Sequence, residues 1–221
     1  MFTLPKALAV TAAMFAIGAQ AATVNYSWED GGAVLGQFDA GQTMQYSNTN
    51  ALARSGSSSL LIEDLDNATS GTPQGYVAWV NGLTDGDTID ASFWAYDTSA
   101  GTSPSVRIWA HYTDDAGDVD SYAGSAGGNT TYSDGLGWSQ LSHSWVFDSD
   151  SGTRDGLMIE VRFYDGSSAT TGAILLDDLY VNTSAGTITT PYASAVPVPA
   201  AAWLFGSAIV GLLGARRARK A

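Results

Sequence analysis

The chain has 221 residues, no cysteine and a formal net charge of −13. Between Ala22 and Ala195, four arginines and no lysine stand against all 22 acidic residues, which gives this part a net charge of −18. That charge argues against nucleic acid and anionic lipid surfaces as partners, and the lack of cysteine excludes disulfides, thiol nucleophiles and cysteine-ligated zinc.

Residues 1–21 predict a secretory signal peptide. Lys6 supplies a positive charge, residues 7–16 are apolar apart from Thr11, and Ala19-Gln20-Ala21 fits a cleavage site with small flanking residues. The alternative is an N-terminal anchor helix, which the short apolar run disfavours.

Residues 22–182 predict one domain built from β-strands. Short segments with alternating apolar and polar residues are separated by turn-forming pairs such as Asn81-Gly82 and Asp155-Gly156. The predicted strands cover residues 58–63, 75–80, 87–96, 105–112, 138–147, 156–164 and 173–181. No segment has a helical period, so the sequence predicts an all-β, jelly-roll β-sandwich. A mostly polar linker is expected over residues 183–195.

Aromatic and polar side chains occupy the polar sides of two predicted strands. The set comprises Asp90, Trp94, Tyr96, Arg107, Trp109 and His111. If the two strands are neighbours, these residues form one strip on a sheet face, where rings stack on sugars and charged groups bond hydroxyls. The other interpretation is that this face forms the second half of the core. Trp79 and Trp145 are expected in the core.

Catalysis has little support in the sequence. His111 and His143 are the two histidines, neither has zinc-ligand spacing, and no G-x-S-x-G motif is present. The run Asp114, Asp115, Asp118 and Asp120 suits a solvated hairpin tip better than a second cation site. We therefore predict that the chain is not an enzyme.

Five landmarks occur in a recognisable order along the domain. They are Trp28-Glu29-Asp30-Gly31, the stretch 55–60, the stretch 86–94, the pair Trp138 and Trp145, and Leu176-Asp177-Asp178-Leu179. Over about residues 26–181 this order resembles carbohydrate-binding jelly rolls of the galactose-binding-like class. The resemblance implies a carbohydrate-binding module with polysaccharide as its partner.

The same resemblance implies a structural calcium ion. In that family the opening glutamate and the closing aspartate often meet at Ca²⁺, and the matching residues here are Glu29, Asp177 and Asp178. Hard oxygen ligands suit this cation, and a metal joining both chain ends would offset the missing disulfides. The alternative is that Asp177 and Asp178 only end a strand by accepting hydrogen bonds from loop amides.

The last 26 residues have three parts. Val196-Pro197-Val198-Pro199 is extended, residues 200–215 are apolar apart from Ser207, and a basic end begins with Arg216 and Arg217. As a helix, the apolar part rises about 24 Å, slightly less than a bilayer core of about 30 Å. The basic end would remain in the cytoplasm.

This tail, residues 196–221, resembles the PEP-CTERM sorting signal, with Val198 in place of the motif's glutamate as in the related VPxPA type. The resemblance implies an inner-membrane transmembrane helix, an exosortase-type membrane protease, and final release to the cell surface or extracellular matrix. The alternative is an anchor that is never cleaved.

Three functions stay open at this point. The first is a surface protein that binds carbohydrate such as exopolysaccharide. The second is a structural or adhesive matrix protein without sugar specificity, and the third and least favoured is a secreted glycoside hydrolase, because no pair of carboxylates stands out.

Overall fold

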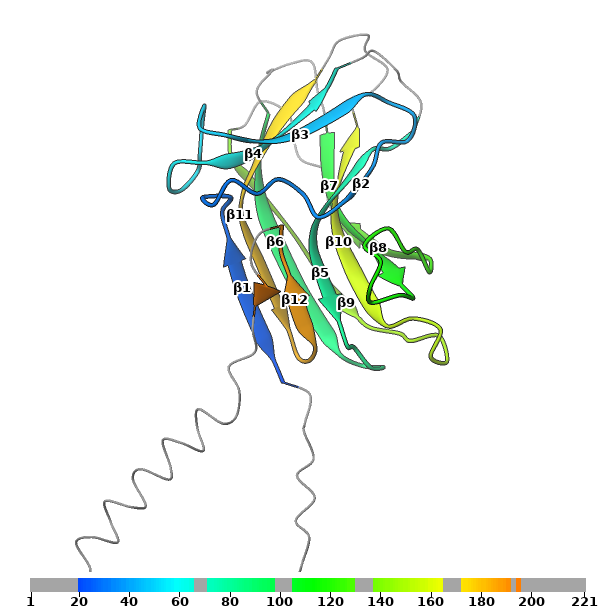
Figure 1. Cartoon of the computed structure of the whole chain (residues 1–221). Coiled ribbons are helices and arrows are strands. Elements are labelled where there is room, and N and C mark those ends of the chain that lie inside the picture. The colour runs from blue at the N-terminus through cyan, green and yellow to red at the C-terminus, as the bar shows by residue number, and fades with distance from the viewer. Residues whose placement is uncertain are drawn as a thin grey trace, which may run out of the picture.

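The computed structural model describes residues 20–65, 71–97, 105–129, 137–164, 172–191 and 194–195. These residues form two antiparallel sheets that pack face to face (Figure 1). The predicted all-β sandwich is therefore confirmed. The predicted sorting tail, and the signal peptide except for Gln20 and Ala21, lie outside these ranges. Within the ranges, no helix is both long and apolar enough to span a bilayer.

Thirteen strands make up the described part of the chain. They are β1 (Ala22–Tyr26), β2 (Gln37–Phe38), β3 (Met44–Thr49), β4 (Ser59–Asp64), β5 (Gln74–Asn81), β6 (Thr88–Asp97), β7 (Ser105–Thr113), β8 (Ser125–Asn129), β9 (Ser139–Val146), β10 (Gly156–Tyr164), β11 (Ala173–Thr183), β12 (Thr187–Thr189) and β13 (Ser194–Ala195).

The strands divide between two sheets. Sheet A has the order β3-β4-β11-β6-β9, with β1 paired to β11, and sheet B has the order β13-β12-β5-β10-β7-β8, with β2 paired to β5. Consecutive strands often lie in different sheets: β5 is in sheet B, β6 in sheet A and β7 in sheet B. This crossing decides which predicted site residues can meet.

The inner faces of the two sheets carry the core. Alternation along each long strand directs one set of apolar side chains inward. Phe93, Ile108, Ile159 and Leu176, from β6, β7, β10 and β11, are all fully buried in one cluster. In β11 the register shifts between Asp177 and Tyr180, so Leu176 and Leu179 both face the core although they are three residues apart.

The segment expected to be a linker, residues 183–195, belongs to the sandwich in its described parts, residues 183–191 and 194–195. It contains β12 and β13, and β12 pairs with β5 through the register Ile188 with Val80. Ile188 is fully buried in the core. A single apolar residue among threonines gave no alternating pattern, which is why the strand was not predicted.

Replacing Phe93 by alanine should destabilise the domain by about 3–5 kcal/mol, because the change leaves a cavity between the sheets. Urea unfolding monitored by tryptophan fluorescence measures this loss. Val146→Ala is the matched control, since Val146 is 65% exposed on neighbouring β9, and it should change stability by less than about 0.5 kcal/mol. Equal effects of the two changes would contradict the assignment of the core.

Candidate functional site

The six residues predicted to form one strip lie on opposite sides of the molecule. Asp90, Trp94 and Tyr96 project from β6 in sheet A, whereas Arg107, Trp109 and His111 project from β7 in sheet B. A continuous strip through both strands is therefore not formed. The reason is that the chain crosses from one sheet to the other between them.

On sheet A, the partly exposed ring of Trp94 is covered by an arginine. The guanidinium carbon of Arg54 lies 3.7 Å from the ring centre, and Arg54 also forms an ion pair with Asp178. Tyr96 packs against Trp138, with ring centres 5.4 Å apart. Trp94 and Tyr96 are therefore already in contact with other side chains of the protein.

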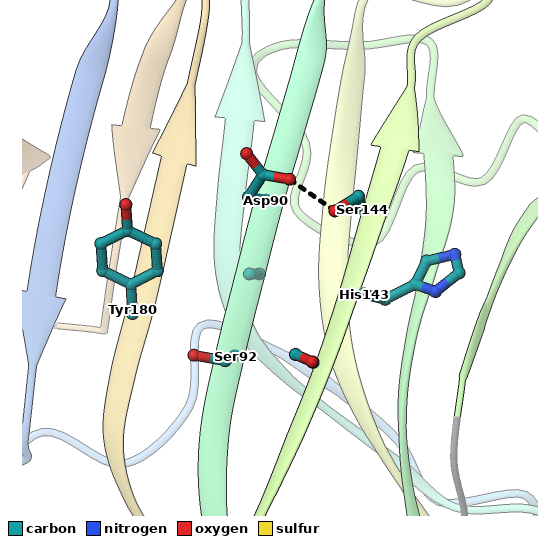
Figure 2. A pocket seen from close by; sticks show the side chains of 7 residues that line it. Asp90, Ser92, His143, Ser144 and Tyr180 are labelled. Carbon is teal, nitrogen blue, oxygen red and sulfur yellow. Dashed lines mark hydrogen bonds between the residues drawn. The ribbon is translucent and has the colours of Figure 1, made fainter.

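Asp90 lies apart from these rings, in a shallow depression of about 450 Å³ on the same sheet. Figure 2 shows its carboxylate directed toward the hydroxyl of Ser144 on β9, with which it forms a hydrogen bond, while Tyr180 stands on the other side on β11. His143 points away from Asp90 in this view. Four of the seven residues that line the depression carry a hydroxyl group, and the carboxylate of Asp90 already has a donor.

The outer face of sheet B has a different character. The register of β10 with β5 and β7 places nine side chains in three rows across the three strands. The rows are Trp79–Met158–His111, Tyr76–Glu160–Trp109 and Gln74–Arg162–Arg107. We call these nine residues the β10 face. Tyr76, Trp79 and Met158 form a small apolar cluster on it, separate from the main core.

The centre of the β10 face holds buried charge. Glu160 is 0% exposed and His111 is 1% exposed, and the carboxylate oxygen Oε1 of Glu160 lies 3.6 Å from Nδ1 of His111. The same oxygen accepts a hydrogen bond of 3.2 Å from Arg162. Within the described residues, Oε2 of Glu160 and both ring nitrogens of His111 have no hydrogen-bond partner. Such buried polar groups are costly unless a partner is supplied.

Aromatic rings surround this polar centre. His111 lies between Tyr76 and Tyr122, with ring centres 5.2 and 5.4 Å away. Burial, with the negative charges of Glu160 and Asp120, raises the pKa of Tyr76 to about 12. Its hydroxyl is therefore a neutral donor at any physiological pH.

Trp109 forms the side of the centre nearest β8. Its indole nitrogen donates to the hydroxyl of Ser125 at 2.8 Å, and the guanidinium carbon of Arg162 lies 4.5 Å from its ring. The ring is partly exposed. Buried acceptors and donors beside a fixed indole can bind a ligand that offers both hydroxyl groups and apolar ring faces.

Sequence reasoning placed three residues on this face and missed the central one. The alternation in residues 156–164 put Glu160 and Arg162 on the polar side of a strand. The missing information was that β10 lies directly between β5 and β7. Trp79 was expected in the core and is indeed buried, although in the smaller cluster of the outer face.

The opening glutamate holds a loop next to β4. Glu29 accepts hydrogen bonds from the amides of Ser57 and Ser58, both at 2.9 Å, and from the Ser57 hydroxyl at 2.8 Å. These bonds hold the pKa of Glu29 below its usual value. Gly56 has a φ of +65°, and a Cβ there would lie 2.2 Å from the carboxylate, so the close approach requires glycine.

The closing aspartates hold the same loop from its other end. Asp177 accepts from the amides of Arg54 at 2.7 Å and Ser55 at 3.0 Å. Asp178 pairs with the Arg54 guanidinium and accepts from the Ser55 hydroxyl. Burial raises the pKa of Asp177, and the amide bonds act in the opposite direction. We call this arrangement of Glu29, Asp177 and Asp178 around residues 54–58 the loop clasp.

The loop clasp bears on the predicted calcium site. The three carboxylates do meet near one loop, but every one of their oxygens accepts from an N–H or O–H donor. Among the described residues no group of three or more potential ligand side chains gathers closely enough to hold a metal. A calcium ion at these residues would have to displace the loop donors, so this arrangement does not fit a calcium cage.

Comparisons with known proteins give a likeness at the level of the fold. No protein-family model and no curated protein matches the chain. The tandem CBM22-1–CBM22-2 domain of Xyn10C from Paenibacillus barcinonensis aligns with a TM-score of 0.52 and 16% identity, over 80% of this chain and 48% of the tandem. This likeness shows a shared β-sandwich fold.

The single domains of the same Xyn10C, each described as xylan-binding, are also similar to the chain. The CBM22-1 domain has a TM-score of 0.48 and 17% identity, over 74% of this chain and 94% of the domain. The CBM22-2 domain has a TM-score of 0.46 and 21% identity, over 73% of this chain and 98% of the domain.

Glu29→Gln should lower stability at neutral pH and lose this effect in acid. Because the folded pKa of Glu29 is lowered from 4.5, its contribution is present above that value and disappears as the pH falls through the folded pKa. Urea midpoints of wild type and variant should differ at pH 7 and converge as the pH falls below the folded pKa of Glu29. Glu63→Gln on β4 removes the same charge from a residue whose cross-strand neighbours are Gln45 and Ala173, and it serves as control. A gap for Glu29→Gln that persists in acid would contradict the clasp.

Proposed function

We propose that the chain is an exported, non-catalytic protein whose domain binds polysaccharide at the β10 face. The observation that carries this proposal is the buried polar centre, where Glu160 and His111 present groups without hydrogen-bond partners among the described residues. Sugar hydroxyls both donate and accept hydrogen bonds, so a glycan that displaces the side chains burying these two residues would satisfy both at once.

The surrounding rings support a sugar rather than a small ion as the ligand. Trp109 has a partly exposed ring next to Glu160, with Arg162 over one of its faces, and Tyr122, 64% exposed, lies against His111. Aromatic rings contribute binding area on the apolar faces of a sugar, while the polar groups fix its orientation. The similar single domains of Xyn10C are described as xylan-binding, so xylan is the first glycan to test.

The proposal excludes hydrolysis at this face. A glycosidase uses two carboxylates on either side of the scissile bond. Within the described part of the β10 face, Glu160 is the one buried carboxylate, and it is engaged by Arg162. It can therefore accept a hydrogen bond from a sugar, and among the nine residues of the β10 face no second carboxylate stands beside it.

Export and sorting complete the proposal and rest on the sequence. The signal peptide would carry the domain across the inner membrane, and the PEP-CTERM-like tail would hold it there until an exosortase-type protease releases it to the cell surface or matrix.

Affinity electrophoresis of the full-length chain in gels containing xylan, other soluble polysaccharides or none tests the binding site. Trp109→Ala should weaken binding about tenfold, since the loss of an aromatic contact costs about 1 kcal/mol or more. Glu160→Gln should weaken it as well, because a carboxylate acceptor is lost. Trp94→Ala removes the equivalent ring from the opposite sheet and should bind like wild type.

The same gels separate the alternatives. Loss of binding in Trp94→Ala but not in Trp109→Ala would move the site to sheet A. No retardation in any gel, with the protein folded by circular dichroism, would refute glycan binding for those polymers and favour a structural matrix protein.

The calcium prediction has its own test at the loop clasp. If calcium binds there, the thermal midpoint of the wild type should be several degrees higher in calcium than in chelator, and Glu29→Gln should abolish the difference. Identical wild-type midpoints would mean that hydrogen bonds alone hold the loop.

A further inference from the structure

We propose that the β10 face selects polysaccharides that carry carboxylate groups, such as uronic acids, and that Arg107 is the selecting residue. This inference rests on the proposed glycan binding and adds the class of ligand. Three observations lead to it: where the arginines lie, which of them have acidic partners, and how far they are from the stacking ring.

Positive charge is scarce in this domain and concentrated on the β10 face. Residues 22–195 contain four arginines and no lysine. Arg107 and Arg162 stand directly opposite each other in the register of β7 with β10. Like charges in this position repel, so a nearby acid is needed for each of them.

Of Arg107 and Arg162, only Arg162 has an acidic partner in the described part of the chain. Arg162 pairs with Glu160 at 3.2 Å. Arg107 packs over the ring of Tyr164 at 4.8 Å, no described carboxylate pairs with it, and its Nε is buried without an acceptor.

The remaining two arginines show the contrast. Arg54 pairs with Asp178, and Arg154 lies within 3.5–3.8 Å of carboxylates of Asp148 and Asp150. In a domain with 22 acidic residues, a cation without an acidic neighbour among the described residues is therefore the exception. It occurs on the β10 face, which also holds the buried polar centre.

A carboxylate is the partner that a guanidinium binds best. The planar fork of N–H groups matches two carboxylate oxygens, and charge-assisted bonds of this kind are about twice as strong as neutral ones. A neutral sugar hydroxyl would leave the charge of Arg107 uncompensated. A uronate would both neutralise Arg107 and relieve its repulsion with Arg162.

The spacing on the strand suits a substituent on a stacked sugar. Arg107 and Trp109 are two residues apart on β7 and so point to the same side, about 7 Å from each other. A sugar ring on Trp109 can therefore direct a carboxylate, its own or that of the next residue, toward Arg107.

The negative net charge of the domain opposes the binding of acidic glycans. A domain of net charge −18 repels polyanions in general. Any preference for an acidic glycan must then arise locally, from the arginine pair.

The test compares one polymer in two forms. Binding of the full-length chain to glucuronoxylan, and to the same glucuronoxylan after chemical reduction of its carboxyl groups, is measured by affinity electrophoresis; a polygalacturonate pair is run in parallel. Wild type should prefer the carboxylate form about tenfold. Arg107→Gln should bring the ratio of the two affinities close to one, and Arg107→Lys should keep part of the preference.

Arg54→Gln is the matched control, because it removes an arginine of the loop clasp, which packs on Trp94 of the opposite sheet, and should leave the ratio unchanged. Equal wild-type affinity for both forms of each polymer would overturn the selectivity while leaving glycan binding intact. Binding to neither form, nor to neutral glycans, would overturn the proposed function itself. The ratio of wild-type affinities for the two forms of one polymer tests the selectivity even if an Arg107 variant fails to fold.

Discussion

The two-residue alternation of β10 is the constraint on which the site depends. The space between the sheets is filled with buried side chains, which on β10 are those of Leu157, Ile159, Val161 and Phe163. The intervening side chains must then lie on the outer side of the strand. Since β10 runs between β5 and β7, Glu160 meets Tyr76 on one side and Trp109 on the other. A shift of one residue would bury the charges in the core.

The same constraint explains why polar groups can be buried outside the core. The segment before β2 crosses the edge of β5, where Leu35 donates its amide to Tyr76 and packs on the small apolar cluster. The loop after β7 brings Val119 against the same cluster. These coverings remove water from one side of the β10 face while Trp109 and Arg107 stay partly exposed. The polar centre is thereby shielded from water, which strengthens the electrostatic interactions within it.

The strands with strict alternation could be predicted from the sequence, and they form the body of both sheets. Phe93 and Ile159 show why: each belongs to a run in which every second residue is apolar, and this pattern has one structural solution. Short strands were missed because they lack the pattern; β8 is Ser-Ala-Gly-Gly-Asn. Only part of the β10 face was predicted, since a sequence does not tell which strands become neighbours. Trp94 and Trp109 look alike in the sequence and lie in different sheets.

The loop clasp, too, was predicted only in part from the sequence. The convergence of Glu29 with Asp177 and Asp178 followed from a resemblance and is present in the structure, whereas the partners of the carboxylates did not follow from it. Amide donors from residues 54–58 fill the places that a cation was expected to take. This difference depends on backbone positions, such as the left-handed conformation of Gly56, that side-chain patterns do not encode.

The order of strands in sheet B also determines how the domain would respond to mechanical tension. A force applied at Ala195 acts first on β13 and β12. These strands are two and three residues long and lie at one edge of the sheet. Their few hydrogen bonds would break one after another, at low force, before β5 is loaded. Strands β10 and β7 lie further in, so the first extension of a tethered molecule would lengthen the chain and leave its outer face intact. In a molecule tethered through its C-terminal tail, β12 and β13 would therefore extend before the rest of the sheet.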